Sequence, residues 1–213
     1  NGAGKTTTID LITGRQKSTS GTIIFDGRAI TSLREDKIAK RGVGRKFQVP
    51  AVFKELTVRD NLRVALNKNT DPFANMFRFG RKEGRERLQE VVELAGLQDR
   101  LDELGGNLSH GETQWLEIGM VLTQDPKLLL MDEPTAGMTE QETQKTSEIF
   151  NRLKGKHTLV VVEHDMAFVR EIADVITLMH LGKTLAEGPM EEVENDPKVK
   201  EVYLGSEGIT DAA

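Results

Sequence analysis

Residues 127–134 read KLLLMDEP, in which four apolar residues stand directly before two carboxylates and a proline. A short, wholly apolar run of this kind is typical of a strand that is buried on both faces of a parallel sheet. Ligands of such sheets bind at the carboxyl ends of the strands. Asp132 and Glu133 are therefore candidates to hold a metal ion and to polarise a water molecule. The alternative is that the two acids have no catalytic role and only form a turn after a buried strand.

Short β-branched runs elsewhere in the chain alternate with helical patterns. We expect strands at residues 21–27, 43–48, 127–134, 157–164, 175–180 and 182–188. This alternation predicts an α/β fold with a mostly parallel sheet that helices cover. Between these strands, residues 57–66 and 83–97 have helical periodicity, which predicts an inserted α-helical subdomain. The predicted division is a core at 1–50 and 116–205, a helical subdomain at 51–115, and a tail at 206–213.

The composition is that of an ordinary globular chain. It has 213 residues, of which 37% are hydrophobic and 30% charged, with a net charge of −5 and no cysteine. The lack of cysteine excludes disulfides and thiolate metal sites and fits a reducing compartment. Basic residues are scattered, so we expect no nucleic-acid partner. The longest apolar runs, at 128–131 and 159–162, are far shorter than the roughly 20 residues needed to span a bilayer.

The chain opens with NGAGKTTT at residues 1–8, which matches the second half of the phosphate-binding pattern G-x-x-x-x-G-K-[ST]. In such a loop, backbone N–H groups surround phosphates at the start of a helix. Lys5 would reach the β- and γ-phosphates, and Thr6 would ligate Mg²⁺. The alternative is a glycine-rich turn that caps a helix. Because the first glycine and its strand are missing, we expect the sequence to be incomplete and these residues alone to bind ATP weakly.

A third candidate lies at the end of another apolar run. The predicted strand at 157–164 ends in His164, at the same edge of the sheet as Asp132 and Glu133. A lone histidine there is usually only a polar residue at a strand end. In combination with the other two motifs, it becomes a candidate contact for a γ-phosphate.

Residues 107–122 read NLSHGETQWLEIGMVL and predict the start of an amphipathic helix. Ser109 and Glu112 fit the S-x-x-E capping box, in which each side chain satisfies the other residue's backbone N–H. Ser109 and Gly111 also fit an anion site at a helix N-terminus, where free N–H groups and the helix dipole favour negative charge. Both interpretations can hold together.

Together these segments resemble the ATP-binding subunit of ABC transporters. The chain presents GAGKTT, a glutamine after a strand, LSHGE, LLLMDEP and EHD in that family's order, over nearly its whole length. The resemblance implies a P-loop NTPase core of the RecA-like kind that hydrolyses ATP with Mg²⁺. It also implies a second ATP-binding subunit, identical or different, paired head to tail. Integral membrane permease subunits would hold the pair peripherally on the cytoplasmic face of the cell membrane.

The resemblance also implies roles for individual residues. ATP would contact the phosphate loop of one subunit and the LSxG segment of the other, through Asn1, Gly2, Ala3, Gly4, Lys5, Thr6, Thr7, Ser109 and Gly111. Residues that would hold Mg²⁺ are Thr6, Gln48 and Asp132. Residues that would serve catalysis are Lys5, Gln48, Glu133 and His164.

The segment around Gln48 would, by the same resemblance, face a membrane partner. Phe47, Val52 and Phe53 place apolar groups beside that glutamine. An equal alternative is that these side chains form a hydrophobic seam between the two subdomains.

The sequence departs from the family pattern at three positions. His110 and Glu112 replace the second glycine and the glutamine of LSGGQ, which puts the backbone geometry there in doubt. Thr139 stands where an aspartate usually contacts the opposite subunit. That cross-subunit contact is therefore also in doubt.

The chain resembles one subgroup of the family most. AGM after the glutamate and the C-terminal MEEVENDPKVKEVYLG are similar to importers of branched-chain amino acids and urea. LSHGETQWLEIG favours the urea or short-amide type. Two alternatives are a soluble ABC-type ATPase that is not coupled to transport and a regulatory nucleotide-binding module without turnover.

Overall fold

The computed structural model describes residues 2–45, 52–66 and 82–207. A parallel sheet of three strands lies at its centre, in the order β3 (Val43–Arg45), β4 (Leu128–Asp132) and β5 (Thr158–Val162). Val43 pairs with Leu128, and Leu128 pairs with Thr158. The fold is α/β, as predicted, and the run at 127–134 forms the middle strand of this sheet.

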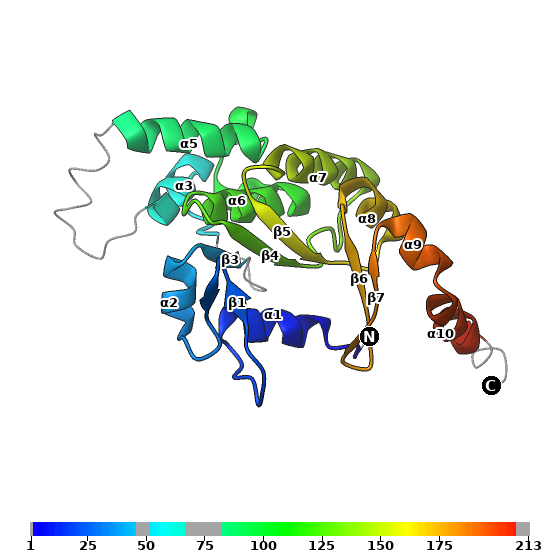
Figure 1. Ribbon diagram of the computed structural model, residues 1–213. Helices are drawn as coiled ribbons and strands as arrows, with labels where there is room; N and C mark the ends of the chain where they lie inside the picture. Colours follow the sequence, from blue (N-terminus) through cyan, green and yellow to red (C-terminus); the bar gives the residue numbers. More distant parts are fainter. Residues whose placement is uncertain (1, 46–51, 67–81, 208–213) are drawn as a thin grey trace.

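Helices cover both faces of the sheet (Figure 1). On one side lie α1 (Lys5–Thr13) and α2 (Glu35–Lys40). On the other lie α3 (Val58–Leu66), α5 (Lys82–Leu94), α6 (His110–Leu122) and α7 (Glu140–Leu153). The remaining helices are α8 (Met166–Ile172), α9 (Met190–Asn195) and α10 (Pro197–Glu207), with 3-10 turns at Gln98–Arg100 and Gly105–Asn107.

The alternation of side chains along β4 explains why its sequence is wholly apolar. Leu129 and Met131 pack into the larger core with residues of α3, α5, α6, α7 and α8. Leu128 and Leu130 point the other way, into a smaller core that includes Ile9 of α1. Since successive side chains of a strand point to opposite faces, a strand between two helical layers needs apolar residues at every position.

Two antiparallel hairpins complete the described structure. The strands expected at 175–180 and 182–188 are present as β6 (Ile176–His180) and β7 (Lys183–Gly188), which pair antiparallel with each other rather than within the parallel sheet. The expected strand at 21–27 is instead short. β1 (Ile24–Phe25) turns at Asp26 and Gly27 and pairs with β2 (Arg28–Ala29). Positive φ angles of 49° and 70° at the two turn residues reverse the chain.

The segment between β3 and β4 is helical where it is described. Residues 52–66 and 82–127 hold α3, α5 and α6 and, within those ranges, no strand longer than an isolated bridge between Thr57 and Leu104. These helices share one core with Leu129 and Met131 of β4. The division into a core and a helical subdomain therefore stays a prediction.

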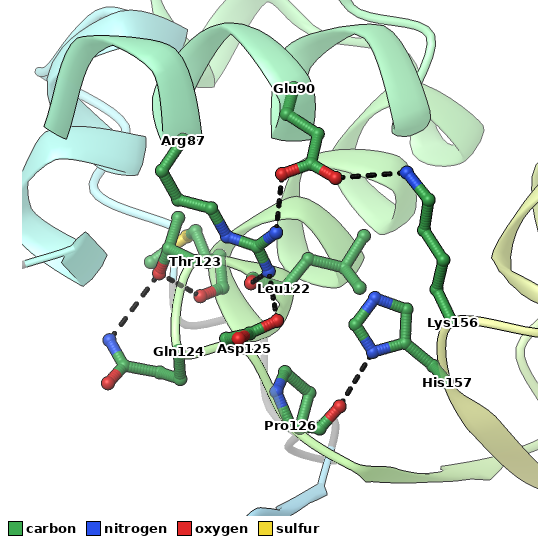
Figure 2. A network of polar contacts seen from close by, with 10 residues as sticks. Arg87, Glu90, Leu122, Thr123, Gln124, Asp125, Pro126, Lys156 and His157 are labelled. Atoms are coloured by element: carbon green, nitrogen blue, oxygen red, sulfur yellow. Dashed lines mark hydrogen bonds and ion pairs between the residues drawn. The ribbon is translucent and has the colours of Figure 1, made fainter. Parts of the chain in front are cut away.

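A polar network ties α5 to the sheet (Figure 2). Arg87 of α5 donates to the carbonyl of Leu122 at 2.6 Å and pairs with Asp125 at 3.0 Å. It also pairs with Glu90, whose other carboxylate oxygen accepts from Lys156, just before β5. At the end of α6 the carbonyl of Leu122 also accepts from the N–H of Asp125 at 2.9 Å, so the guanidinium is a second donor to this carbonyl.

Across the part of the chain that the structure describes, no helix is long and apolar enough to cross a membrane.

Candidate functional site

The loop before α1 leaves the start of that helix uncapped by any side chain. Gly4 is the N-cap residue, with a φ of +96°, and no side chain accepts a hydrogen bond there. A Cβ at Gly4 would lie 3.3 Å from the Cα of Gly182, and the N–H of Gly182 donates to the carbonyl of Ala3 at 3.0 Å. The turn between β6 and β7 therefore supports the loop, while the free N–H groups of α1 suit an anion.

The phosphate loop and the end of β4 meet at one hydrogen bond. Thr6 Oγ1, in the first turn of α1, donates to Asp132 Oδ2 at 3.0 Å. Asp132 is the last residue of β4 and is half-buried. Lys5 and Thr7 flank Thr6 on α1, so the GKT sequence lies at the carboxyl edge of the sheet.

The residues at this edge fit a magnesium ion. A hydroxyl oxygen and a carboxylate oxygen are the ligands that Mg²⁺ prefers, and the ion usually takes only one or two protein ligands beside phosphate oxygens and water. Within the described ranges no group of three or more His, Cys, Asp or Glu could hold a metal by itself. Thr6 and Asp132 therefore suit an ion that arrives with a phosphate.

Glu133 and His164 lie together beside this pair. Glu133 has a φ of +48°, an uncommon value for a residue other than glycine, and its N–H donates to the carbonyl of Val162 at 2.8 Å. His164 Nδ1 lies 3.6 Å from Glu133 Oε1, and both side chains are exposed to solvent. The two side chains are neighbours at a distance longer than a hydrogen bond.

Glu163 is a neighbour that the sequence patterns did not single out. Its side chain is 1% exposed and lies 3.7 Å from His164 Nδ1. Its carboxylate accepts hydrogen bonds from the N–H and hydroxyl of Thr135 and from the N–H of His164. Glu163 thereby connects the end of β5 to the loop that follows Glu133. Its signals in the sequence were its place at the end of an apolar run and in the EHD motif, where no role was assigned to it.

The capping box at the start of α6 is present. Ser109 Oγ accepts from the N–H of Glu112 at 3.1 Å, and Glu112 accepts from the N–H of Ser109 at 2.9 Å. The same serine hydroxyl donates to Glu142 Oε1 at 2.9 Å, and the N–H of Gly111 donates to that oxygen at 3.2 Å. Glu142, on α7, is a second residue that sequence reasoning missed.

The hydrogen bonds at Glu142 favour its charged form. The N–H of Thr139 and the hydroxyl of Ser109 lower the pKa of this carboxyl, with further contributions from the Thr139 hydroxyl and the N–H of Gly111, while burial opposes the shift. The N-terminus of α6 therefore holds a carboxylate from its own chain.

The three departures from the family pattern all make contacts within the chain. His110 Nε2 lies 3.0 Å from the carbonyl of Ala136, after Glu133. Glu112 pairs with Arg100 at 2.7 Å. Thr139 is the N-cap of α7 and forms a second capping box with Glu142.

The structure thus brings Thr6, Asp132, Glu133 and His164 to one edge of the sheet, and it places Ser109 and Gly111 against Glu142. Asn1, Phe47 and Gln48 lie outside the described residues, so their predicted roles stay predictions. Of the other two apolar residues, Phe53 is exposed, whereas Val52 packs on the larger core.

Comparison with known families gives two matches. The ABC transporter family model matches residues 1–136. The model of the branched-chain amino acid ATP-binding cassette transporter matches residues 183–209, from β7 to α10.

Curated relatives and solved structures agree with these matches. The high-affinity branched-chain amino acid transport ATP-binding protein LivG of Salmonella typhimurium is 37% identical over 96% of this chain and 84% of its own length. BraF of Pseudomonas aeruginosa, a protein of the same description, is 36% identical over the same shares. The ADP conformation of MJ1267, an ATP-binding cassette of an ABC transporter, superimposes with a TM-score of 0.81 and 32% identity, over 96% of this chain and 85% of that one.

Proposed function

This chain belongs to the ABC transporter family of ATP-binding proteins, and from that premise we propose that it powers the import of branched-chain amino acids. Proteins of this family hydrolyse ATP to drive transport, and this chain is such an ATPase. Its solute, its partners and the roles of its residues are parts of the proposal.

One family model and two curated relatives support branched-chain amino acids as the solute. Residues 183–209 match the family model for that subgroup, and both LivG and BraF are described as branched-chain amino acid transport proteins. Urea or short amides, which LSHGETQWLEIG favoured, gain no support from these relatives. A soluble ATPase and a regulatory module without turnover are not favoured either.

The hydrogen bond between Thr6 and Asp132 carries the assignment of the ATP site. It joins the loop that would bind phosphate to the carboxylate that would face the metal. The uncapped N–H groups of α1 would hold the β- and γ-phosphates, and Lys5 would neutralise part of their charge. Thr6 and Asp132 would hold Mg²⁺, whose positive charge would stabilise the negative charge that develops on the phosphate oxygens.

Glu133 would act on the attacking water. Its carboxylate would accept a proton from the water as the water oxygen forms a bond to the γ-phosphorus and the bond to the β-phosphate oxygen breaks. His164, 3.6 Å away, would orient this carboxylate or contact the γ-phosphate. Gln48 and Asn1 would complete the site in the roles that the family resemblance implies.

The proposed assembly contains two ATP-binding subunits and membrane permease subunits. Ser109 and Gly111 of one subunit would close on the ATP that the other holds, with the pair on the cytoplasmic face of the cell membrane. Because each nucleotide would then contact both subunits, ATP binding favours the pair and hydrolysis releases it.

Uptake by the complete transporter tests the solute. The full-length protein would be co-purified with its permease and binding protein, reconstituted in vesicles, and supplied with labelled leucine or labelled urea. We expect ATP-dependent leucine uptake, with urea no faster than leakage. Uptake of urea but not leucine would contradict the proposed solute.

A Glu133→Gln variant tests the catalytic role in the same preparation. We expect ATP hydrolysis to fall by roughly 10²–10⁴-fold, the usual contribution of a general base, while ATP still binds. An Asp165→Asn variant is a suitable control, because Asp165 is an acid that directly follows His164 but caps α8, where it accepts from the N–H groups of Ala167 and Phe168. An unchanged rate in Glu133→Gln would remove the assignment.

A further inference from the structure

Glu142 joins the N-termini of two helices with one carboxylate. Its Oε2 accepts from the N–H of Thr139 at 3.0 Å and closes the capping box of α7. Its Oε1 crosses to α6, where it accepts from the hydroxyl of Ser109 at 2.9 Å and from the N–H of Gly111 at 3.2 Å. Only the first set of contacts belongs to the cap of its own helix.

The carboxylate leaves no room for a second anion on the same donors. A Cβ placed on Gly111 would lie 2.5 Å from both Cδ and Oε1 of Glu142, so the carboxylate rests directly on the glycine backbone. The Ser109 hydroxyl has one proton, which is directed at Oε1. A phosphate oxygen can therefore use the Ser109 hydroxyl and the Gly111 N–H only after Glu142 Oε1 has left them.

Charge adds to this exclusion. The bonds from Thr139, Ser109 and Gly111 lower the pKa of Glu142 and so favour its negative charge, and two negative groups at one helix N-terminus repel each other. Glu142 can release α6 without leaving its own helix cap, because Thr139 contacts Oε2. That oxygen can stay on the α7 cap while Oε1 turns away from α6. The release then costs the two bonds to α6 rather than the whole cap.

We propose that Glu142 competes with the γ-phosphate of ATP for the same hydrogen-bond donors. In an unpaired subunit, Glu142 occupies the donors of the LSxG segment, Ser109 and Gly111. It must be displaced from them before two subunits close on ATP. This inference rests on the proposed function, in which Ser109 and Gly111 receive the ATP of the second subunit. Glu142 thereby raises the ATP concentration that pairing requires and opposes closure of subunits on weakly bound nucleotide.

Pairing of the full-length protein in the Glu133→Gln background tests the inference, because slow hydrolysis lets the ATP-bound pair accumulate. Sedimentation would give the ATP concentration at which half of the protein is paired, with and without Glu142→Gln. The substitution keeps an oxygen for Thr139 but removes the charge. We expect half-pairing at an ATP concentration at least about fivefold lower, the lower end of the usual coupling between sites.

Two further variants control for helix capping and for net charge. Glu142→Asp keeps the charge but shortens the reach to α6, so we also expect half-pairing at a lower ATP concentration. This variant tests the inference if Glu142→Gln fails to fold. Glu140→Gln removes a charge from the same exposed first turn of α7 and should leave the half-pairing concentration unchanged.

The outcomes separate this inference from the proposed function. If the Glu133→Gln protein pairs with ATP but both Glu142 variants need as much ATP or more, the competitor role is wrong and the proposed function stands. If the Glu133→Gln protein does not pair at any ATP concentration, the proposed pairing and the competitor role are both wrong.

Discussion

Thr6 and Asp132 are separated by 126 positions in the chain, yet Thr6 Oγ1 donates a 3.0 Å hydrogen bond to Asp132 Oδ2. The bond sets the first turn of α1 against the end of β4, at the edge where parallel strands present their ligands. Two oxygen atoms suited to Mg²⁺ therefore lie side by side.

Replacement of Thr6 by valine should lower the ATPase rate of the full-length protein by roughly 10–100-fold, the range seen when groups that orient a metal site are removed. Valine keeps the shape of threonine but has no hydroxyl for the metal or for Asp132. Thr6→Ser restores the hydroxyl and should recover most of the rate. A rate that is kept in Thr6→Val but lost in Thr6→Ser would show that the methyl group, not the hydroxyl, is what the site needs.

Replacement of Arg87 by alanine should lower the free energy of unfolding by about 2 kcal/mol, because the carbonyl of Leu122 and the carboxylates of Glu90 and Asp125 all lose a donor. Urea denaturation measures the change. Arg152→Ala is the control, since it removes only an exposed pair with Glu148 at 3.5 Å and should cost less than about 0.5 kcal/mol. A similar cost for both variants would contradict a special role of the network.

The network in Figure 2 also predicts a pH dependence. Hydrogen bonds from Arg87 and then Lys156 hold the pKa of Glu90 below its usual value, although burial opposes them. A carboxyl whose pKa is lower in the folded state stabilises the protein above its unfolded pKa, about 4.3, and this stabilisation is lost as the pH falls through the folded value.

Unfolding by urea at a series of pH values, for the wild type and Glu90→Gln, checks this dependence. Because Glu90 is partly exposed, we expect the free energy of unfolding of the wild type to exceed that of Glu90→Gln by less than about 1 kcal/mol at pH 7. The difference should shrink as the pH falls below about 4. A difference that is constant across this range would contradict the predicted origin of the shift.

Replacement of Gly111 by alanine should destabilise the protein by about 1–3 kcal/mol, because the new Cβ would meet Glu142 Cδ at 2.5 Å. In a Glu142→Ala background this clash is absent, and alanine, the better helix former, should then be neutral or slightly stabilising. The four free energies of unfolding form a double-mutant cycle. Additive costs would show that Glu142 does not limit the residue at position 111.

Features that depend on neighbours in the chain were predictable from local patterns. The four apolar residues before Asp132 predicted a strand buried on both faces, and β4 sends Leu128 and Leu129 into different cores. The spacing of Ser109 and Glu112 predicted the capping box of α6. A pattern of this kind spans only a few residues, so the strand or helix that it forms can be predicted without knowledge of the rest of the fold.

Features that depend on distant segments could not be predicted from local patterns. The strand expected at 21–27 ended early because Asp26 and Gly27 form a turn. The apolar run did not show that this strand pairs with Arg28–Ala29. Glu142 belonged to no motif, and Glu163 stood in EHD without an assigned role. They gained their roles when α7 packed beside α6 and when β5 ended beside Thr135.

The residue types and their order along the chain thus determined the α/β class and the family, because periodicity, capping and short motifs are properties of neighbouring residues. The packing of helices and strands decided that Thr6 meets Asp132 and that Glu142 covers the donors of α6. Such contacts form only when distant segments pack together in the folded chain. A motif of a few residues does not specify which distant side chain will contact it.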